Sequence, residues 1–168
     1  DYKPPPKNSS TETGAELRYI AHIVSNQPSD QPRLDELDKS FFKVFIRYAK
    51  ENDLKFDKSW LKDLIKDSAK LILRLKKSYD RPRPFQLTDY HNTSIDYNRK
   101  IQSELGTAKS PSYPSGHATQ AYLLAGILSK ENPDHRENLM AIAAEVAQSR
   151  LKAGVHFPTD NEFGKVLA

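Results

Sequence analysis

The chain has no cysteine among its 168 residues. Disulfide bonds, thiolate nucleophiles and cysteine-bound zinc are therefore excluded as sources of stability or chemistry. The lack of cysteine does not fix the compartment, because periplasmic proteins can also lack disulfides.

Long hydrophobic runs are absent as well. The longest apolar stretches, such as residues 121–128, are far shorter than the roughly 18 residues that a membrane-spanning helix needs, so we expect a soluble chain. No signal peptide is recognisable. Residues 1–7, with three consecutive prolines, resemble a Pro-rich tether, which hints at export.

The composition is that of a folded protein. Hydrophobic residues make up 37% and charged residues 29% of the chain, and its length suits a single domain. We expect a Pro-rich polar tail over residues 1–15 and one helical domain over residues 16–168. The net charge of +4 favours anionic partners, but phosphate esters, nucleic acid and a membrane surface would all satisfy it.

Apolar residues recur at helical spacing along most of the chain, and no strand pattern or internal repeat is present, so we predict an all-α bundle. The expected helices cover residues 16–24, 34–51, 60–79, 117–130 and 136–152. Gly154 is expected to follow the last of these as a left-handed cap. A further helix is expected from Thr159, which stands in capping-box spacing with Glu162.

Two prolines interrupt the pattern after residue 79. Residues that precede a proline are pushed to extended geometry, so residues 80–85 cannot continue the helix before them. We expect a polar loop from there to about Ser112.

Three short segments carry residues suited to chemistry on phosphate. The first pairs Lys76 with Arg83-Pro84 in K-x6-R-P spacing. The second is residues 112–117, with the letters SYPSGH. The third reads S-R-x5-H-x3-D and comprises Ser149, Arg150, His156 and Asp160.

The cations in these segments suit a phosphoryl group. Phosphoryl transfer spreads negative charge over three oxygens and needs fixed donors around them. Arg83 and Arg150 offer planar forks that grip two oxygens at once, and Lys76 adds a point charge. Each cation taken alone is more simply explained as solvated surface charge, and only the joint pattern favours the clamp.

Ser115 and Gly116 precede a predicted helix. Free backbone N–H groups and the positive end of the helix dipole form an anion site there, and glycine lets the backbone approach closely. His117 would then face a bound ester and can protonate its leaving oxygen. In isolation, residues 114–116 are better explained as a turn and an N-cap, and His117 directly after them shifts the balance toward an anion site.

His156 and Asp160 are four residues apart, close enough for the carboxylate to fix the tautomer of the imidazole. The other ring nitrogen is then free to attack phosphorus. The pair can also bind a metal or cap a helix. The remaining histidines form no compact ligand set with it; they are His22, His91 and His135.

Together, the three segments resemble the signature of the type 2 phosphatidic acid phosphatase superfamily, and residues 112–117 look like those of the bacterial class A non-specific acid phosphatases. The resemblance spans residues 76–160, about half of the chain. It implies an all-α fold with a site where the second long helix, the His117 helix and the His156 segment converge. It gives the implied roles to eight residues: phosphate binding to Lys76, Arg83, Ser115, Gly116 and Arg150, acid to His117, nucleophile to His156, orienting carboxylate to Asp160.

A second register exists, because Arg74 lies as far from Arg81-Pro82 as Lys76 lies from Arg83-Pro84. The family motif begins with lysine, so we prefer Lys76 and Arg83. The first half of the chain offers helices but no motif of its own.

The resemblance implies a phosphatase that hydrolyses phosphate monoesters through a phosphohistidine, with no metal and no cofactor. A small phosphate monoester is the expected substrate, a phospholipid-derived one stays open, and we expect no nucleic-acid partner. A periplasmic or secreted location follows from likeness to exported acid phosphatases, and the sequence leaves homo-oligomerisation open. The rival functions are a vanadium-dependent haloperoxidase, disfavoured by the short chain, and a non-catalytic anion-binding module, which leaves the His156–Asp160 pair unexplained.

Overall fold

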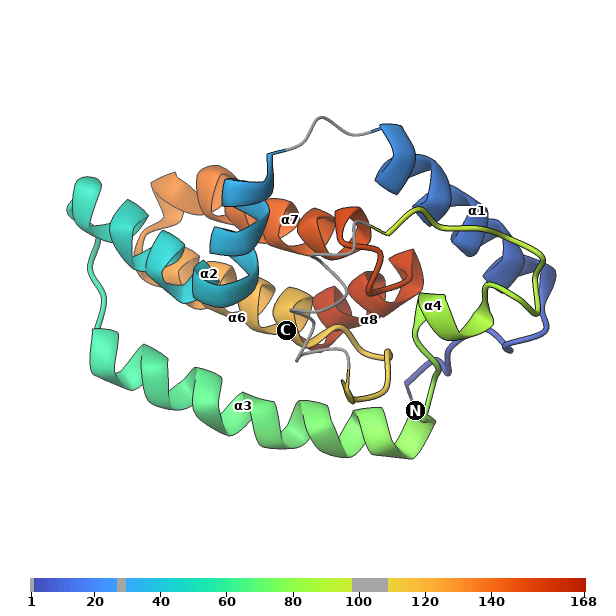
Figure 1. The fold of residues 1–168 in the computed structure, drawn as a ribbon. Helices are drawn as coiled ribbons and strands as arrows, with labels where there is room; N and C mark the ends of the chain where they lie inside the picture. The colour runs from blue at the N-terminus through green and yellow to red at the C-terminus, as the bar shows by residue number, and fades with distance from the viewer. Residues whose placement is uncertain (1, 27–29, 98–108) are drawn as a thin grey trace.

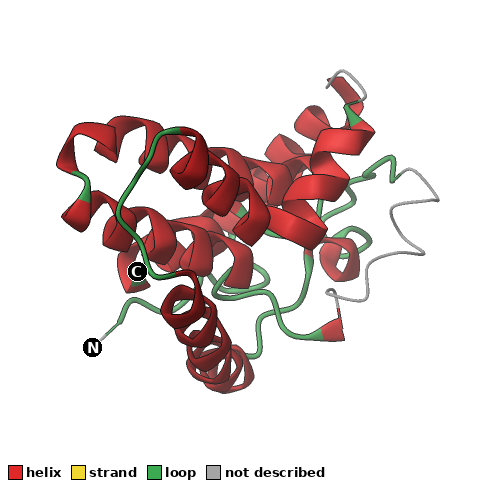
Figure 2. Ribbon diagram, turned by 90° about the vertical axis from the view of Figure 1, so that its left-hand side faces the viewer, coloured by secondary structure: helices red, strands yellow, loops and turns green. Residues whose placement is uncertain are grey.

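The computed structural model describes residues 2–26, 30–97 and 109–168. Within these ranges only helices and loops occur, as Figure 2 shows, and the predicted all-α fold is confirmed. The helices are α1 (Thr11–Asn26), α2 (Gln31–Glu51), α3 (Lys58–Tyr79), α4 (Pro84–Leu87), α6 (Gly116–Glu131), the 3-10 turn η2 (Pro133–His135), α7 (Arg136–Lys152) and α8 (Pro158–Leu167).

The predicted helix ends agree with the structure at two turns. The helix α3 ends at Tyr79, and Asp80 then takes a left-handed conformation (φ 47°) ahead of the two prolines. The helix α7 ends at Lys152, and Gly154 follows with φ +68°. A Cβ built on Gly154 would lie 2.5 Å from the Tyr97 ring, so both space and backbone require glycine here.

Other helix boundaries differ from prediction. The helix α1 begins at Thr11, inside the expected tail, because the Ser10 hydroxyl accepts from the Thr13 N–H (3.1 Å) and caps it. The helix α8 begins at Pro158 rather than at Thr159. Its capping box uses the side chain of Asp160 and not that of Glu162, because Asp160 accepts a hydrogen bond from the Phe157 N–H (2.8 Å). The short helix α4 lies in the expected loop, of which residues 98–108 fall outside the described ranges.

The helix α6 lies between its neighbours and supplies the small residues that let them approach. Its buried face carries Ala118, Ala121 and Ala125 beside Leu124 and Leu128. The same hydrophobic core takes side chains from α2 and α7, including Phe45 and Leu139, both fully buried. Figure 1 shows α3 running along one edge of the bundle, below α6 in that view.

A smaller apolar cluster joins the first helix to the rest of the protein. Leu17 and Ile20 of α1 pack with Leu87 of α4 and with Phe157, which lies just before α8. This cluster places α1 against the start of α8. Within the described residues, no helix is both long and apolar enough to cross a bilayer.

Candidate active site

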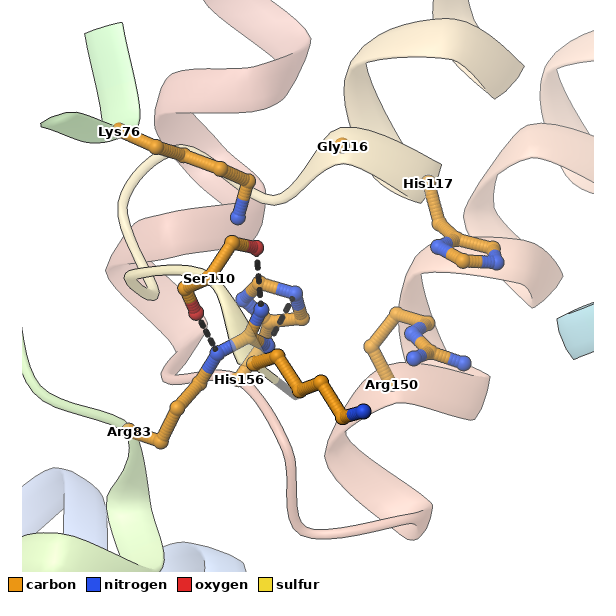
Figure 3. A pocket seen from close by; sticks show the side chains of 8 residues that line it. Lys76, Arg83, Ser110, Gly116, His117, Arg150 and His156 are labelled. Atoms are coloured by element: carbon orange, nitrogen blue, oxygen red, sulfur yellow. Dashed lines mark hydrogen bonds between the residues drawn. The ribbon is translucent and has the colours of Figure 1, made fainter. Parts of the chain in front are cut away.

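A cavity of about 400 Å³ lies where the end of α3, the start of α6 and the end of α7 meet. Figure 3 shows the side chains that line it. They are Lys76, Arg83, Lys109, Ser110, Gly116, His117, Arg150 and His156. The structure therefore brings most of the predicted site residues to one cavity, while Ser115 and Asp160 are buried and do not line it.

Lys76 and Arg83 are held by backbone carbonyls of the wall. Lys76 Nζ donates to Pro111 O at 2.7 Å, and Arg83 Nε donates to Ser110 O at 2.8 Å. Burial, together with nearby Arg83, lowers the pKa of Lys76 to about 7. Burial also lowers the pKa of Arg83 to about 10. Crowded cations without an anion are electrostatically unfavourable, and a bound oxyanion would relieve this.

Arg150 presents two donor atoms that have no acceptor among the described residues. Its side chain is almost fully buried, and Nη1 donates to Asp38 Oδ1 at 2.6 Å. Its Nε and Nη2 are buried and find no acceptor in the described part of the chain. Because buried unpaired donors are costly, an oxyanion in the adjoining cavity is the kind of group that would satisfy them.

The contacts of His156 define its tautomer. Arg83 Nη1 lies 2.9 Å from His156 Nε2, and a guanidinium can only donate, so Nε2 carries the lone pair. The other nitrogen, Nδ1, lies 3.0 Å from Asp160 Oδ2 and must carry the proton. Burial holds the pKa of His156 well below its usual range, and Arg83 and Lys76 act in the same direction. The imidazole is therefore neutral, with its lone pair on the cavity side (Figure 3).

Asp160 is fully buried and carries several hydrogen bonds besides the one to His156. Its Oδ2 accepts from Ser112 Oγ and from the Phe157 N–H, and its Oδ1 accepts from Arg81 Nη1 at 2.7 Å. Burial raises the pKa of Asp160, and the Arg81 guanidinium acts in the opposite direction. The Asp160 carboxylate caps the start of α8 and also contacts His156 Nδ1. A helix cap and a partner for the imidazole are therefore compatible in this residue.

His117 is held by α2. Its Nε2 donates to the Asp38 carbonyl at 2.8 Å and lies 3.6 Å from Asp38 Oδ1. The helix α2 is kinked at Ser40 (φ −144°), just after Asp38. With Nε2 bound to Asp38, Nδ1 is the nitrogen that can exchange a proton with a ligand. Burial, followed by Arg150, lowers the pKa of His117 to about 4.

Ser115 does not offer the free N–H that we expected. Its N–H donates to Asp160 O at 3.0 Å, and its hydroxyl caps α6 by accepting from the Ala118 N–H at 3.3 Å. Gly116, the first residue of α6, does line the cavity, and an N–H at that position has no acceptor within the helix. Of the two residues, only Gly116 lines the cavity, while Ser115 caps the helix.

Sequence reasoning missed Glu16, Asp38 and Arg81. Arg81 belongs to the register that we set aside, yet it is buried and bonded to Asp160, while Arg74 of the same register is exposed. Glu16 and Asp38 lie in helices α1 and α2, which carry no motif, and they reach the site only through folding. The described residues contain no group of three His, Asp or Glu side chains arranged as metal ligands.

Comparison with known proteins identifies the family of the chain. The family model described as "PAP2 superfamily", the type 2 phosphatidic acid phosphatases, matches residues 66–168. The chain belongs to the PAP2 superfamily. That match includes all eight residues to which the sequence resemblance gave a role. The recognition of this superfamily from sequence is confirmed.

Bacterial acid phosphatases are similar to the chain. A non-specific acid phosphatase of Providencia stuartii is 32% identical over 109 residues, which cover 64% of this chain and 42% of that protein. One of Salmonella typhi is 27% identical over 177 residues, covering 99% of this chain and 68% of that protein. The chain thus matches less than half the length of the Providencia protein.

A solved structure shares the fold. It is a transmembrane PAP2-type phosphatidylglycerolphosphate phosphatase of Bacillus subtilis, with a TM-score of 0.58 and 22% identity. The match covers 94% of this chain and 79% of that protein. At this identity the likeness concerns the helical fold alone, and it confirms a bundle of the PAP2 type.

Proposed function

We propose that the chain hydrolyses phosphate monoesters in two steps, through a phosphohistidine on His156. The observation that carries the proposal is the arrangement of His156 in the cavity. Its lone pair on Nε2 faces a space lined by three buried cations, and its Nδ1–H is held by a buried carboxylate. This is the arrangement of an activated nucleophile beside an anion site.

Lys76, Arg83 and Arg150 would bind the phosphoryl oxygens. Arg150 offers Nε and Nη2, which have no acceptor in the described residues, and the start of α6 at Gly116 adds a helix N-terminus. In the structure, Arg83 Nη1 donates a hydrogen bond to the lone pair on His156 Nε2 at 2.9 Å. In this proposal an incoming phosphate oxygen accepts the hydrogen bond from Arg83 Nη1 in place of His156, which frees Nε2 to approach phosphorus.

In the first step Nε2 of His156 forms a bond to phosphorus while the bond from phosphorus to the ester oxygen breaks. The leaving oxygen takes a proton from His117, whose Nε2 stays bonded to Asp38. Positive charge on the phosphorylated imidazole is stabilised by Asp160 through the Nδ1–H bond. Asp160 therefore acts as the orienting carboxylate.

In the second step a water molecule attacks phosphorus and the bond between phosphorus and nitrogen breaks. Neutral His117 now accepts the proton of the water, which restores the imidazolium for the next cycle. Inorganic phosphate then leaves and Arg83 returns to Nε2. The three cations supply the positive charge that metal ions supply in other phosphatases, so we propose that turnover needs no divalent ion.

Resemblance to non-specific acid phosphatases supports a small water-soluble ester as the substrate, with a phospholipid-derived ester as the alternative. The cavity of about 400 Å³ accommodates a phosphate head and part of a small leaving group. The same resemblance supports a periplasmic location as part of this proposal.

A substrate panel tests the proposal. Purified protein should hydrolyse aryl phosphates and small phosphate monoesters at acidic pH, and His156→Ala should lower kcat by about 10³-fold or more. Lys66→Ala, an exposed cation earlier on α3, is the matched control and should keep its kcat. A His156→Ala variant with wild-type turnover would refute the assignment of the nucleophile.

A further inference from the structure

A buried chain of charges links the first helix to the proposed nucleophile. Arg81 has no exposed side-chain surface, and its two terminal nitrogens bind different carboxylates. Nη1 donates to Asp160 Oδ1 at 2.7 Å, and Nη2 donates to Glu16 Oε2 at 2.8 Å. Asp160 in turn contacts His156 Nδ1 at 3.0 Å.

Each contact in this chain is reinforced. The Arg81 guanidinium carbon lies 3.9 Å from the centre of the Phe157 ring, so the side chain is stacked as well as bonded. Glu16 Oε1 accepts from both the N–H and the hydroxyl of Thr159, at 2.8 and 2.7 Å, in the first turn of α8. Glu16 therefore fixes both the arginine and the helix start that presents Asp160.

From this geometry we infer that Arg81 and Glu16 are positioning residues for the His156–Asp160 pair. The inference rests on the proposed role of His156, but it assigns a task to residues outside the motifs that the superfamily resemblance used. Arg81 holds one oxygen of Asp160, which leaves the other directed at His156 Nδ1. Glu16 holds Arg81 from the far side, so that α1 becomes part of the catalytic apparatus.

The electrostatic task of Arg81 is to keep a fully buried carboxylate charged. Burial disfavours charge on Asp160, and the guanidinium at 2.7 Å favours it. Other charged or titratable groups act on Asp160 from several segments: Glu16 on α1 through Arg81, Lys76 on α3, Arg83 before α4, Tyr113 before α6 and His156 after α7. None of these groups forms an ion pair with Asp160 Oδ1 in the described residues, whereas Arg81 does.

An NMR titration of the Asp160 carboxyl carbon in ligand-free protein tests this directly. Arg81→Met should raise the pH at which Asp160 titrates by about one to three units, because a neighbouring cation shifts a carboxyl by that much. The side-chain nitrogen spectrum of His156 should change as well, from a single Nδ1–H tautomer to a mixture of the two tautomers. In Arg81→Lys, Asp160 should titrate at nearly the wild-type pH, since lysine keeps the positive charge.

Glu16→Gln should shift the same titration in the opposite direction, to lower pH, because it removes a negative charge close to Asp160. Arg74→Met, which removes an exposed cation from α3, is the control and should leave the titration unchanged. If Arg81→Met does not fold, Glu16→Gln still decides the matter. An Asp160 titration that stays at the wild-type pH in Arg81→Met and Glu16→Gln, or in Glu16→Gln where Arg81→Met does not fold, would overturn the inference.

The titration separates this inference from the proposed function, since it needs no turnover. A wild-type protein that hydrolyses no phosphate ester would refute the function while the Asp160 shifts still report on positioning. If the protein is active, the acidic limb of its pH–rate profile should move to higher pH in Arg81→Met together with the Asp160 titration. A merely structural role would lower the rate and leave that limb in place.

Discussion

His117→Asn should make the ligand-free protein more resistant to acid. Burial and Arg150 lower the pKa of His117 from an ordinary 6.5 to about 4 in the folded protein. Between these values the unfolded chain binds a proton at His117 that the folded chain does not. The free energy of unfolding therefore falls as the pH falls through this window. Asparagine fills a similar space, can donate to the Asp38 carbonyl and cannot take up the proton.

The size of the effect follows from the shift. A displacement of about 2.5 pH units, at about 1.4 kcal/mol per unit, gives an upper value of about 3.5 kcal/mol, most of it lost between pH 6.5 and 4. The His117 side chain is 17% exposed, so solvent reduces this figure only in part. His156 contributes in the same direction, because its pKa is also lowered. Subtracting the free energy of unfolding of the wild type from that of the variant at each pH cancels the contributions of His156 and of the carboxyl groups.

Denaturant unfolding at several pH values between 6.5 and 4.5 measures the effect. The free-energy difference between His117→Asn and wild type should grow in favour of the variant as the pH falls. Saturating inorganic phosphate should shrink this gap, since a bound anion raises the pKa of His117 and favours its protonated form. A gap that is constant across the pH range would refute the assignment of a depressed His117 pKa.

Three further outcomes follow from the proposed chemistry. Hydrolysis of an aryl phosphate should survive strong chelation, and loss of activity that a divalent ion restores would show that a metal is required. Vanadate should inhibit competitively, because its trigonal-bipyramidal form would accept hydrogen bonds from Arg83, Arg150 and Gly116. Halide oxidation by the vanadate-loaded protein with peroxide would instead support the haloperoxidase alternative. The pH–rate profile should be a bell on the acidic side of neutrality, and His117→Asn should remove its alkaline limb; an unchanged bell would assign that limb to another group.

The helices and the cavity residues can both be predicted from the sequence, but for different reasons. Helical periodicity and proline placement are local, so the ends of α3 and α7 could be predicted from neighbouring residues. The cavity residues were predictable because their spacing resembles a known signature. Neither kind of signal reports hydrogen bonds between distant segments, which explains the difference at Ser115. Its N–H is taken by Asp160 O, a partner 45 positions further along the chain.

The supporting residues show the same limit. Glu16 reaches Arg81 across 65 positions, and Asp38 reaches Arg150 across 112. A single acidic residue on an amphipathic helix has the appearance of solvated surface until folding buries it. Arg81 did carry a signal, its place in the second K/R-x6-R-P register. Spacing alone could not show that this arginine supports the carboxylate rather than the phosphate.

Trapping the phosphoenzyme tests the central claim most directly. Protein quenched during turnover of a labelled aryl phosphate should carry a label that acid releases and base does not, as expected for phosphorus bound to nitrogen. His156→Ala should carry none, whereas His117→Ala should still be labelled by substrates with very good leaving groups, which need less protonation to depart. Undiminished labelling of His156→Ala, stable in acid and released by base, would contradict a phosphohistidine at this position.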